Sequence, residues 1–194
     1  MCGTGARCAA WLVAQRLRGR ARKLSLETGA GVLEAVVTGE RVRIQLSNPK
    51  DLRQRMDVPV DGRSIRLGFV NTGVPHAVVP VPSLDGVDVD RLGRQLRFHK
   101  AFGPRGANVN FIQPQSPTRL RIRTYERGVE GETLACGTGV CAAAILHHLR
   151  TGDPAPIAVR VRGGETLRVG FEKNGEAFHK VTLTGPADFV FDGT

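Results

Sequence analysis

The chain contains one sequence unit twice, and this repeat constrains its fold more than any other feature. The tetrapeptide CGTG, followed by an apolar and alanine-rich run, begins at Cys2 and again at Cys136. Each run ends in basic residues and a glycine, so each copy predicts a loop that leads into a helix. Both runs are apolar on nearly every side, and we therefore expect both helices to be buried.

Two alternating strands follow each of these helices. Residues 29–49 and 163–186 alternate apolar and polar side chains, with a turn between the two strands and a proline near the end. In the second copy, Asn174-Gly175 is a strong signal for a hairpin turn. The sequence thus predicts an α+β fold of two pseudo-symmetric halves, each a helix wrapped by antiparallel strands. We place the halves at residues 1–55 and 56–194.

The two copies differ in what precedes them. Strand patterns at residues 67–81, 106–114 and 119–128 come before Cys136, whereas no equivalent comes before Cys2. If the halves are equivalent, residues 70–135 have a counterpart upstream of Met1. We therefore expect the first half to be incomplete, and the helix after Cys2 to be partly uncovered.

Composition restricts the classes of function. The net charge of +10 permits nucleic-acid binding, but the basic residues are spread along the chain, and one Trp and one Tyr give no stacking surface. The densest basic cluster, residues 16–23, fits a solvated helix end. No apolar stretch is long enough to span a bilayer, and no signal peptide is recognisable. We expect a cytoplasmic protein that binds neither nucleic acid nor membrane.

The four cysteines indicate acid–base chemistry rather than metal binding. On a regular helix the two cysteines of each copy point in different directions, so neither pair chelates zinc well. We expect Cys8 and Cys141 to be buried packing residues. Cys2 and Cys136 stand at helix N-termini, where the helix dipole favours an anion and lowers a thiol pKa.

Two such thiols in pseudo-symmetric halves predict a particular reaction. If the two helix N-termini face each other across a cleft, one thiolate removes a proton from a bound molecule. The opposite thiol then returns a proton with inverted configuration. A redox pair normally uses C-x-x-C, which is absent, while a covalent cysteine enzyme remains an alternative to either copy taken alone.

Further polar residues that could contact a substrate lie in three motifs. VNTGVPHAVV contains Asn71 and His76 between apolar runs, and GANVNF places Asn108 and Asn110 on one face of a strand. The loop YERGVEGETLACGTG leads into Cys136. Its arginine could bind a carboxylate, and its first glutamate could orient an ammonium group or a thiol.

Together these residues closely resemble the diaminopimelate epimerases. The resemblance runs along the whole chain through MCGTGARC, VNTGVPHAVV, GANVNF, ERGVEGETLACGTG and FVFDG. GANVNF separates this family from the proline racemases and the phenazine-type isomerases. The resemblance implies two mixed halves, each a barrel-like sheet around a central helix, with the active site between them. It also implies a homodimer that interconverts LL- and meso-diaminopimelate in lysine biosynthesis, without metal or pyridoxal phosphate.

The resemblance assigns roles to individual residues. Cys2 and Cys136 become the acid–base pair, and His76 and Glu126 become the groups that tune the two thiols. The helix-terminal residues that cradle a substrate carboxylate are Gly3, Thr4, Gly137 and Thr138. The remaining substrate contacts are Asn71, Asn108 and Arg127 at the distal end, with Glu126 also near the amine.

Two departures from the family pattern leave alternatives open. The family usually has Asn where this chain has Thr4, and it carries a segment before MCG that the chain lacks. The second departure leaves open whether the chain as given is weakly stable or inactive. The alternatives are another cofactor-free amino-acid racemase of the same fold, or a family member that binds ligand without turnover. A basic nucleic-acid binder is a further alternative, which salt-dependent retention on DNA would test.

Overall fold

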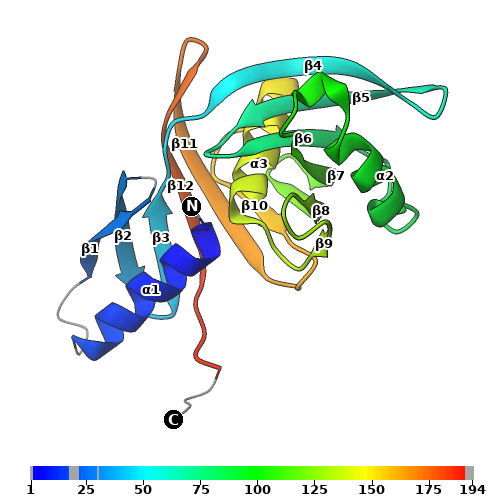
Figure 1. Ribbon diagram of the computed structural model, residues 1–194. Helices are drawn as coiled ribbons and strands as arrows, with labels where there is room; N and C mark the ends of the chain where they lie inside the picture. The colour runs from blue at the N-terminus through cyan, green and yellow to red at the C-terminus, as the bar shows by residue number, and fades with distance from the viewer. Residues whose placement is uncertain (1, 18–21, 30, 191–194) are drawn as a thin grey trace.

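The computed structural model describes residues 2–17, 22–29 and 31–190. Three helices, one short 3-10 helix and twelve strands make up this part of the chain (Figure 1). The helical elements are α1 (Gly3–Arg16), α2 (Val89–Arg97), η1 (Lys100–Phe102) and α3 (Gly137–Thr151). Parts of the basic cluster at residues 16–23 and of the FVFDG motif lie outside the described residues.

The strands form one continuous, open and mixed sheet. Its order is β1-β2-β3-β12-β11-β10-β8-β7-β6-β5-β4, with β9 paired to β8. β6 is parallel to β7 and β8 is parallel to β10, while the other pairs are antiparallel. The strands are β1 (Lys23–Thr28), β2 (Gly31–Thr38), β3 (Arg41–Gln45), β4 (Lys50–Val60), β5 (Arg63–Asn71), β6 (Pro75–Pro80), β7 (Asn108–Ser116), β8 (Arg119–Glu126), β9 (Gly131–Thr133), β10 (Ile157–Arg160), β11 (Thr166–Asn174) and β12 (Ala177–Pro186).

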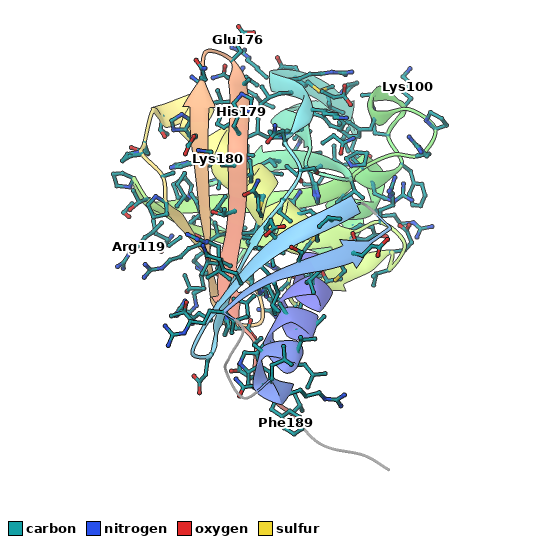
Figure 2. The ribbon with its side chains drawn as sticks, turned by 90° about the vertical axis from the view of Figure 1, so that its left-hand side faces the viewer. Lys100, Arg119, Glu176, His179, Lys180 and Phe189 are labelled. Atoms are coloured by element: carbon teal, nitrogen blue, oxygen red, sulfur yellow. The ribbon has the colours of Figure 1, made fainter. Side chains whose placement is uncertain are left out.

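Each of the two CGTG motifs begins a helix that packs on strands, as the repeat predicts. α3 contacts β4 to β8 and β10 to β12, and the sheet curves around it (Figure 1). α1 contacts β1, β2, β3 and β12. The hairpins that follow the helices are β2–β3 and β11–β12, and Figure 2 places Glu176 at the turn of the second one. The predicted α+β architecture is confirmed.

The expectation that both helices are buried holds for α3 only. Every residue of α3 from Gly137 to His147 is buried. On α1 one face alone is buried, and Leu12, Val13 and the C-cap residue Leu17 are between 39% and 47% exposed. This helix is therefore partly uncovered, because strands pack on only one side of it. Cys8 lies on the exposed side, so its predicted packing role is wrong, whereas Cys141 is buried.

Two hydrophobic cores lie on opposite sides of the sheet. The larger one surrounds α3 and continues into the first half, where it includes Ala10 and Ala14 of α1 and Ile44 of β3. The smaller one lies between α2 and the strands around β7, and it includes Leu96 and Tyr125. Because β12 pairs with β3 on one side and β11 on the other, the sheet runs from one half into the other without a break. The division at residues 55 and 56 stays a prediction.

Within the described residues, no helix has both the length and the apolar character needed to cross a membrane.

Candidate active site

The N-termini of α1 and α3 meet, and two glycines allow this close approach. A Cβ atom on Gly137 would lie 2.9 Å from Leu183 Cδ2 and 3.5 Å from the Cα of Gly3. A Cβ atom on Gly3 would lie 3.2 Å from the same leucine carbon. The glycine that follows each cysteine therefore leaves room for Leu183 of β12, which packs against both helix N-termini.

Cys2 and Cys136 are the N-cap residues of these two helices. Both have extended backbone conformations, as N-cap residues usually do. The Cys2 sulfur accepts a hydrogen bond from the Gly5 N–H at 3.4 Å, and the side chain is exposed. Cys136 is only 8% exposed, and its sulfur lies 3.5 Å from the Thr138 hydroxyl.

A small cleft of about 130 Å³ lies between the two helix N-termini and contains both thiols. Most of the site residues expected from the sequence line it. The residues around the cleft are Cys2, Gly3, Thr4, Val74, Asn108, Glu126, Arg127, Ala135, Cys136, Gly137 and Thr138. His76 and Asn71 are the expected site residues that are absent from this lining.

Burial raises the pKa of the Cys136 thiol, with the charge of Glu126 acting in the same direction. The nearby Thr138 hydroxyl and Gly139 N–H oppose this rise. The sequence predicts a lowered thiol pKa at the helix N-terminus, and for Cys136 this prediction is wrong. The reason is that the thiol is removed from water, which penalises the thiolate.

His76 lies behind the cleft as part of a buried polar cluster. Its ring nitrogens face two side chains: Nε2 is 3.0 Å from the Thr138 hydroxyl, and Nδ1 is 3.1 Å from the Asn110 amide nitrogen. Burial, together with the charge of Arg127, lowers the pKa of His76 to about 3. The imidazole is therefore neutral at physiological pH and reaches the thiol of Cys136 only through Thr138.

Asn108 and Asn110 lie on β7 and point to the same side, as the period of a strand predicts. Asn108 fixes two backbone segments: its amide donates to the Pro75 carbonyl at 3.1 Å and accepts from the Arg127 N–H at 2.8 Å. Asn110 is one of the polar residues that the sequence offers as a substrate contact, but it does not line the cleft. The strand alternation places it beside Asn108, but no sequence signal links it to His76.

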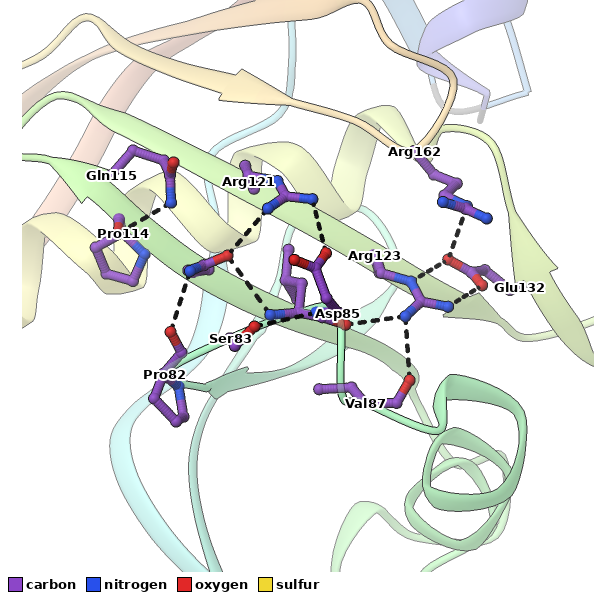
Figure 3. A network of polar contacts seen from close by, with 12 residues as sticks. Pro82, Ser83, Asp85, Val87, Pro114, Gln115, Arg121, Arg123, Glu132 and Arg162 are labelled. Carbon is purple, nitrogen blue, oxygen red and sulfur yellow. Dashed lines mark hydrogen bonds and ion pairs between the residues drawn. The ribbon is translucent and has the colours of Figure 1, made fainter.

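Glu126 and Arg127 stand at the end of β8, in a turn that two ion pairs hold in place. Arg123 of β8 pairs with Glu132 of β9 at 2.6 Å and also donates to the Leu84 and Val87 carbonyls (Figure 3). Hydrogen bonding to Glu132 raises the pKa of Arg123. On the other side of the turn, Arg97 of α2 binds Glu130 at 2.9 Å.

Asn71 has a local role in the structure. Its side-chain oxygen accepts a hydrogen bond from the Gly73 N–H at 3.0 Å, which forms a turn between β5 and β6. The neighbouring Thr72 is the residue of this loop that bonds the α3 N-terminus, since its hydroxyl donates to the Thr138 carbonyl at 2.9 Å. A substrate contact of Asn71 stays a prediction.

Comparison with known proteins agrees with the resemblance found in the sequence. The family model described as diaminopimelate epimerase matches residues 68–190. The diaminopimelate epimerase of Aquifex aeolicus is 45% identical over 197 residues, which cover all of this chain and 68% of that protein. The diaminopimelate epimerase of Chlorobaculum tepidum is 42% identical and is covered over 74% of its length.

Solved structures share the fold at much lower identity. A probable proline racemase from Agrobacterium radiobacter superimposes with a TM-score of 0.71 at 18% identity, over 99% of this chain and 68% of that chain. A PhzF-family phenazine biosynthesis protein from Bacillus anthracis gives a TM-score of 0.70 at 17% identity, over 96% and 73% of the two chains. The two CGTG helices, the mixed sheet around them and the relatives at 42–45% identity lead to one assignment. The chain belongs to the diaminopimelate epimerase family.

Proposed function

We propose that this chain is an isomerase that inverts the α-carbon of LL-diaminopimelate to give meso-diaminopimelate, a step of lysine biosynthesis. The observation that carries the proposal is the cleft that contains both N-cap thiols, in a chain of this family. Cys2 and Cys136 act as the acid–base pair, since each thiol can reach the same bound molecule from a different helix.

The reaction moves one proton in and one proton out. A thiolate on one side takes the α-proton and becomes a thiol, and the thiol on the other side gives its proton to the opposite face of the carbon. The N–H groups of the first turns, next to Gly3, Thr4, Gly137 and Thr138, bind the substrate carboxylate. They also stabilise the negative charge that develops on it in the transition state.

The remaining residues of the cleft bind the rest of the substrate. Arg127 and Asn108 take the distal end of the molecule, where a guanidinium group suits a carboxylate. Glu126 accepts from the substrate ammonium group, and its charge acts on the neighbouring Cys136. His76 tunes the site from behind through Thr138.

Exchange of the α-proton tests this proposal. The purified chain is incubated with LL-diaminopimelate in D₂O, and the α-proton signal and the meso isomer are followed by NMR. We expect exchange together with formation of the meso isomer, and loss of the meso isomer in both Cys2→Ala and Cys136→Ala. A folded chain that catalyses no exchange would contradict it.

Two further measurements distinguish this proposal from another racemase and from a chain that binds ligand without turnover. A panel of amino acids without a distal carboxylate tests for another racemase, because Arg127 has no partner on such substrates. Calorimetric binding of diaminopimelate without exchange would instead identify a chain that binds ligand without turnover.

The homodimer and the cytoplasmic location implied by the resemblance are also proposals. The exposed apolar side chains of α1, which include Leu12 and Val13, leave apolar surface in contact with solvent in the single chain. Sedimentation equilibrium measures the mass in solution, and a mass of one chain at micromolar concentration would contradict a dimer.

A further inference from the structure

We infer that Asn110 is a positioning residue: its amide fixes the tautomer of His76 so that the Thr138 hydroxyl donates a hydrogen bond to the Cys136 sulfur. Three elements meet in this network, since Asn110 lies on β7, His76 on β6, and Thr138 on α3, with Cys136 at the N-cap of that helix. Asn110 and His76 are both fully buried.

The orientation of the Asn110 amide follows from its neighbours. Its nitrogen lies 3.0 Å from the Ala77 carbonyl oxygen, and its oxygen lies 3.0 Å from the Thr124 hydroxyl. A carbonyl oxygen can only accept, so the amide nitrogen faces Ala77 and the amide oxygen accepts from Thr124. One N–H remains, and it points to His76 Nδ1 at 3.1 Å.

The orientation of the amide then determines the tautomer of His76. Since Nδ1 accepts from Asn110, the proton of the neutral imidazole resides on Nε2. Nε2 lies 3.0 Å from Thr138 Oγ1 and donates to it. The lowered pKa of His76 agrees with a ring that has a single proton.

The hydrogen bond from His76 determines which atom the Thr138 hydroxyl can donate to. It accepts from His76, so its own proton is available for the Cys136 sulfur at 3.5 Å. A donor at this position favours the thiolate over the thiol. It opposes the burial of Cys136 and the charges of Glu126 and Cys2, which all disfavour the thiolate. The Gly139 N–H, like Thr138, lowers the pKa of the Cys136 thiol.

Packing holds the cluster together from the helix side. A Cβ atom on Gly139, in the first turn of α3, would overlap Asn110 Oδ1 and would lie 3.4 Å from His76 Cε1. The absence of a side chain at this position thus lets the amide lie directly against the helix. The effect on catalysis rests on the proposed function, whereas the tautomer and the hydrogen bond do not.

The test measures the tautomer and the thiol separately, without substrate. The ¹⁵N shifts of the His76 ring distinguish the two tautomers. Alkylation of Cys136 across a range of pH, quantified on its peptide by mass spectrometry, gives the acidity of the thiol independently of Cys2 and Cys8. We expect the wild-type ring to have its proton on Nε2, and a wild-type ring protonated on Nδ1 would overturn the inference.

Asn110→Asp should reverse the direction of both hydrogen bonds made by the His76 ring. A carboxylate can only accept, so it takes the proton of Nδ1, and Nε2 then accepts from Thr138. Cys136 loses its donor, and we expect its alkylation below the thiol pKa to become about tenfold slower. A switched tautomer with unchanged alkylation would overturn the inference.

The chain offers a matched control and a second variant. Asn48 lies 3.3 Å from the ring of His179, and both residues are exposed, so Asn48→Asp makes the same change outside the site (Figure 2 shows His179 on β12). It should leave Cys136 unchanged. Should Asn110→Asp fail to fold, the wild-type tautomer and the pair Thr138→Val and Thr138→Ser decide. The valine variant should slow alkylation about tenfold, and the serine variant, which keeps the hydroxyl, should restore it.

Discussion

Cys136 and His76 are both buried beside a charged residue, and burial moves their pKa values in opposite directions. The thiol pKa rises because burial and Glu126 disfavour the thiolate. The imidazole pKa falls because burial and Arg127 disfavour the imidazolium. Both groups are uncharged at neutral pH, so ionisation of Cys136 depends on the hydrogen-bond donors around it.

The lowered pKa of His76 makes the stability of the fold depend on pH. Because the native pKa is about 3 and the unfolded value is 6.5, the unfolded chain binds the proton first as the pH falls. This contribution is complete above pH 6.5 and is lost as the pH falls towards 3. We expect the free energy of unfolding to fall in this range by up to about 1.4 kcal/mol per pH unit from this residue.

Urea unfolding at several pH values measures this slope. His76→Asn should show a shallower slope between pH 6.5 and 3, whereas the exposed His179→Asn should match the wild type. Equal slopes in all three proteins would show that His76 titrates normally.

At the scale of single residues, the sequence predicts which residues lie in the cleft better than it predicts what surrounds them. The residues of the cleft follow from motifs, because CGTG and the loop before it are contiguous in the chain. The burial of Cys136 and the bond between Asn110 and His76 depend on side chains brought together from separate strands and a helix. No local pattern encodes such contacts, so the predicted direction of the thiol pKa is wrong, and the sequence offers Asn110 only as a substrate contact and not as a partner of His76.

At the scale of elements, the contact between the first turns of α1 and α3 holds the two thiols in one cleft. Gly137→Ala places a methyl group 2.9 Å from Leu183 Cδ2. Either the Leu183 side chain or the first turn of α3 must shift, and we expect a loss of about 1–3 kcal/mol of stability. Isomerase activity should fall more than stability suggests, because the separation of the thiols changes.

A double-mutant cycle checks this prediction. Leu183→Ala removes the side chain that the new methyl group meets, so the two substitutions should be less harmful together than the sum of their separate effects. Denaturant unfolding gives the coupling free energy. If the two losses of stability are additive, the loss in Gly137→Ala does not arise from its contact with Leu183.

The turn that contains Glu126 and Arg127 depends on Arg97 of α2. Arg97 binds Glu130 and also donates to the Arg105 carbonyl at 3.0 Å. Arg97→Met should cost about 2 kcal/mol of stability and raise KM more than it lowers kcat, because the turn loses its anchor. The exposed Arg91 of the same helix pairs with Asp61, and Arg91→Met should change neither quantity by much.

The elements with local sequence signals were predicted well. Glycines and apolar runs indicated α1 and α3, and turn residues indicated the hairpins β2–β3 and β11–β12. The parallel pair β6–β7 and the pairing of β3 with β12 join segments far apart in the chain. These pairings depend on the shared core, which alternation within one strand does not describe.

At the scale of the whole molecule, one hydrophobic core extends through both halves. We therefore expect a single cooperative unfolding transition, because both halves contribute to the larger core. The chain has one Trp and one Tyr, and these report on the two halves: Trp11 lies on α1 and Tyr125 on β8. Coincident denaturation curves from tryptophan fluorescence of the wild type and tyrosine fluorescence of a Trp11→Phe variant would agree with this expectation. Separate midpoints would instead support independent domains divided near residue 55.

The two helix N-termini that meet at Leu183 make the stability of the fold sensitive to a bound anion. Each N-terminus has a partial positive charge, so the first turns of α1 and α3 are like poles held together by packing around Leu183. An anionic ligand between them neutralises the two partial positive charges. A bound substrate therefore also stabilises the folded chain. Its binding therefore stabilises the native chain, by about 2.7 kcal/mol at a hundred times the Kd. The resistance of such a chain to unfolding and proteolysis would then rise and fall with the supply of its own substrate.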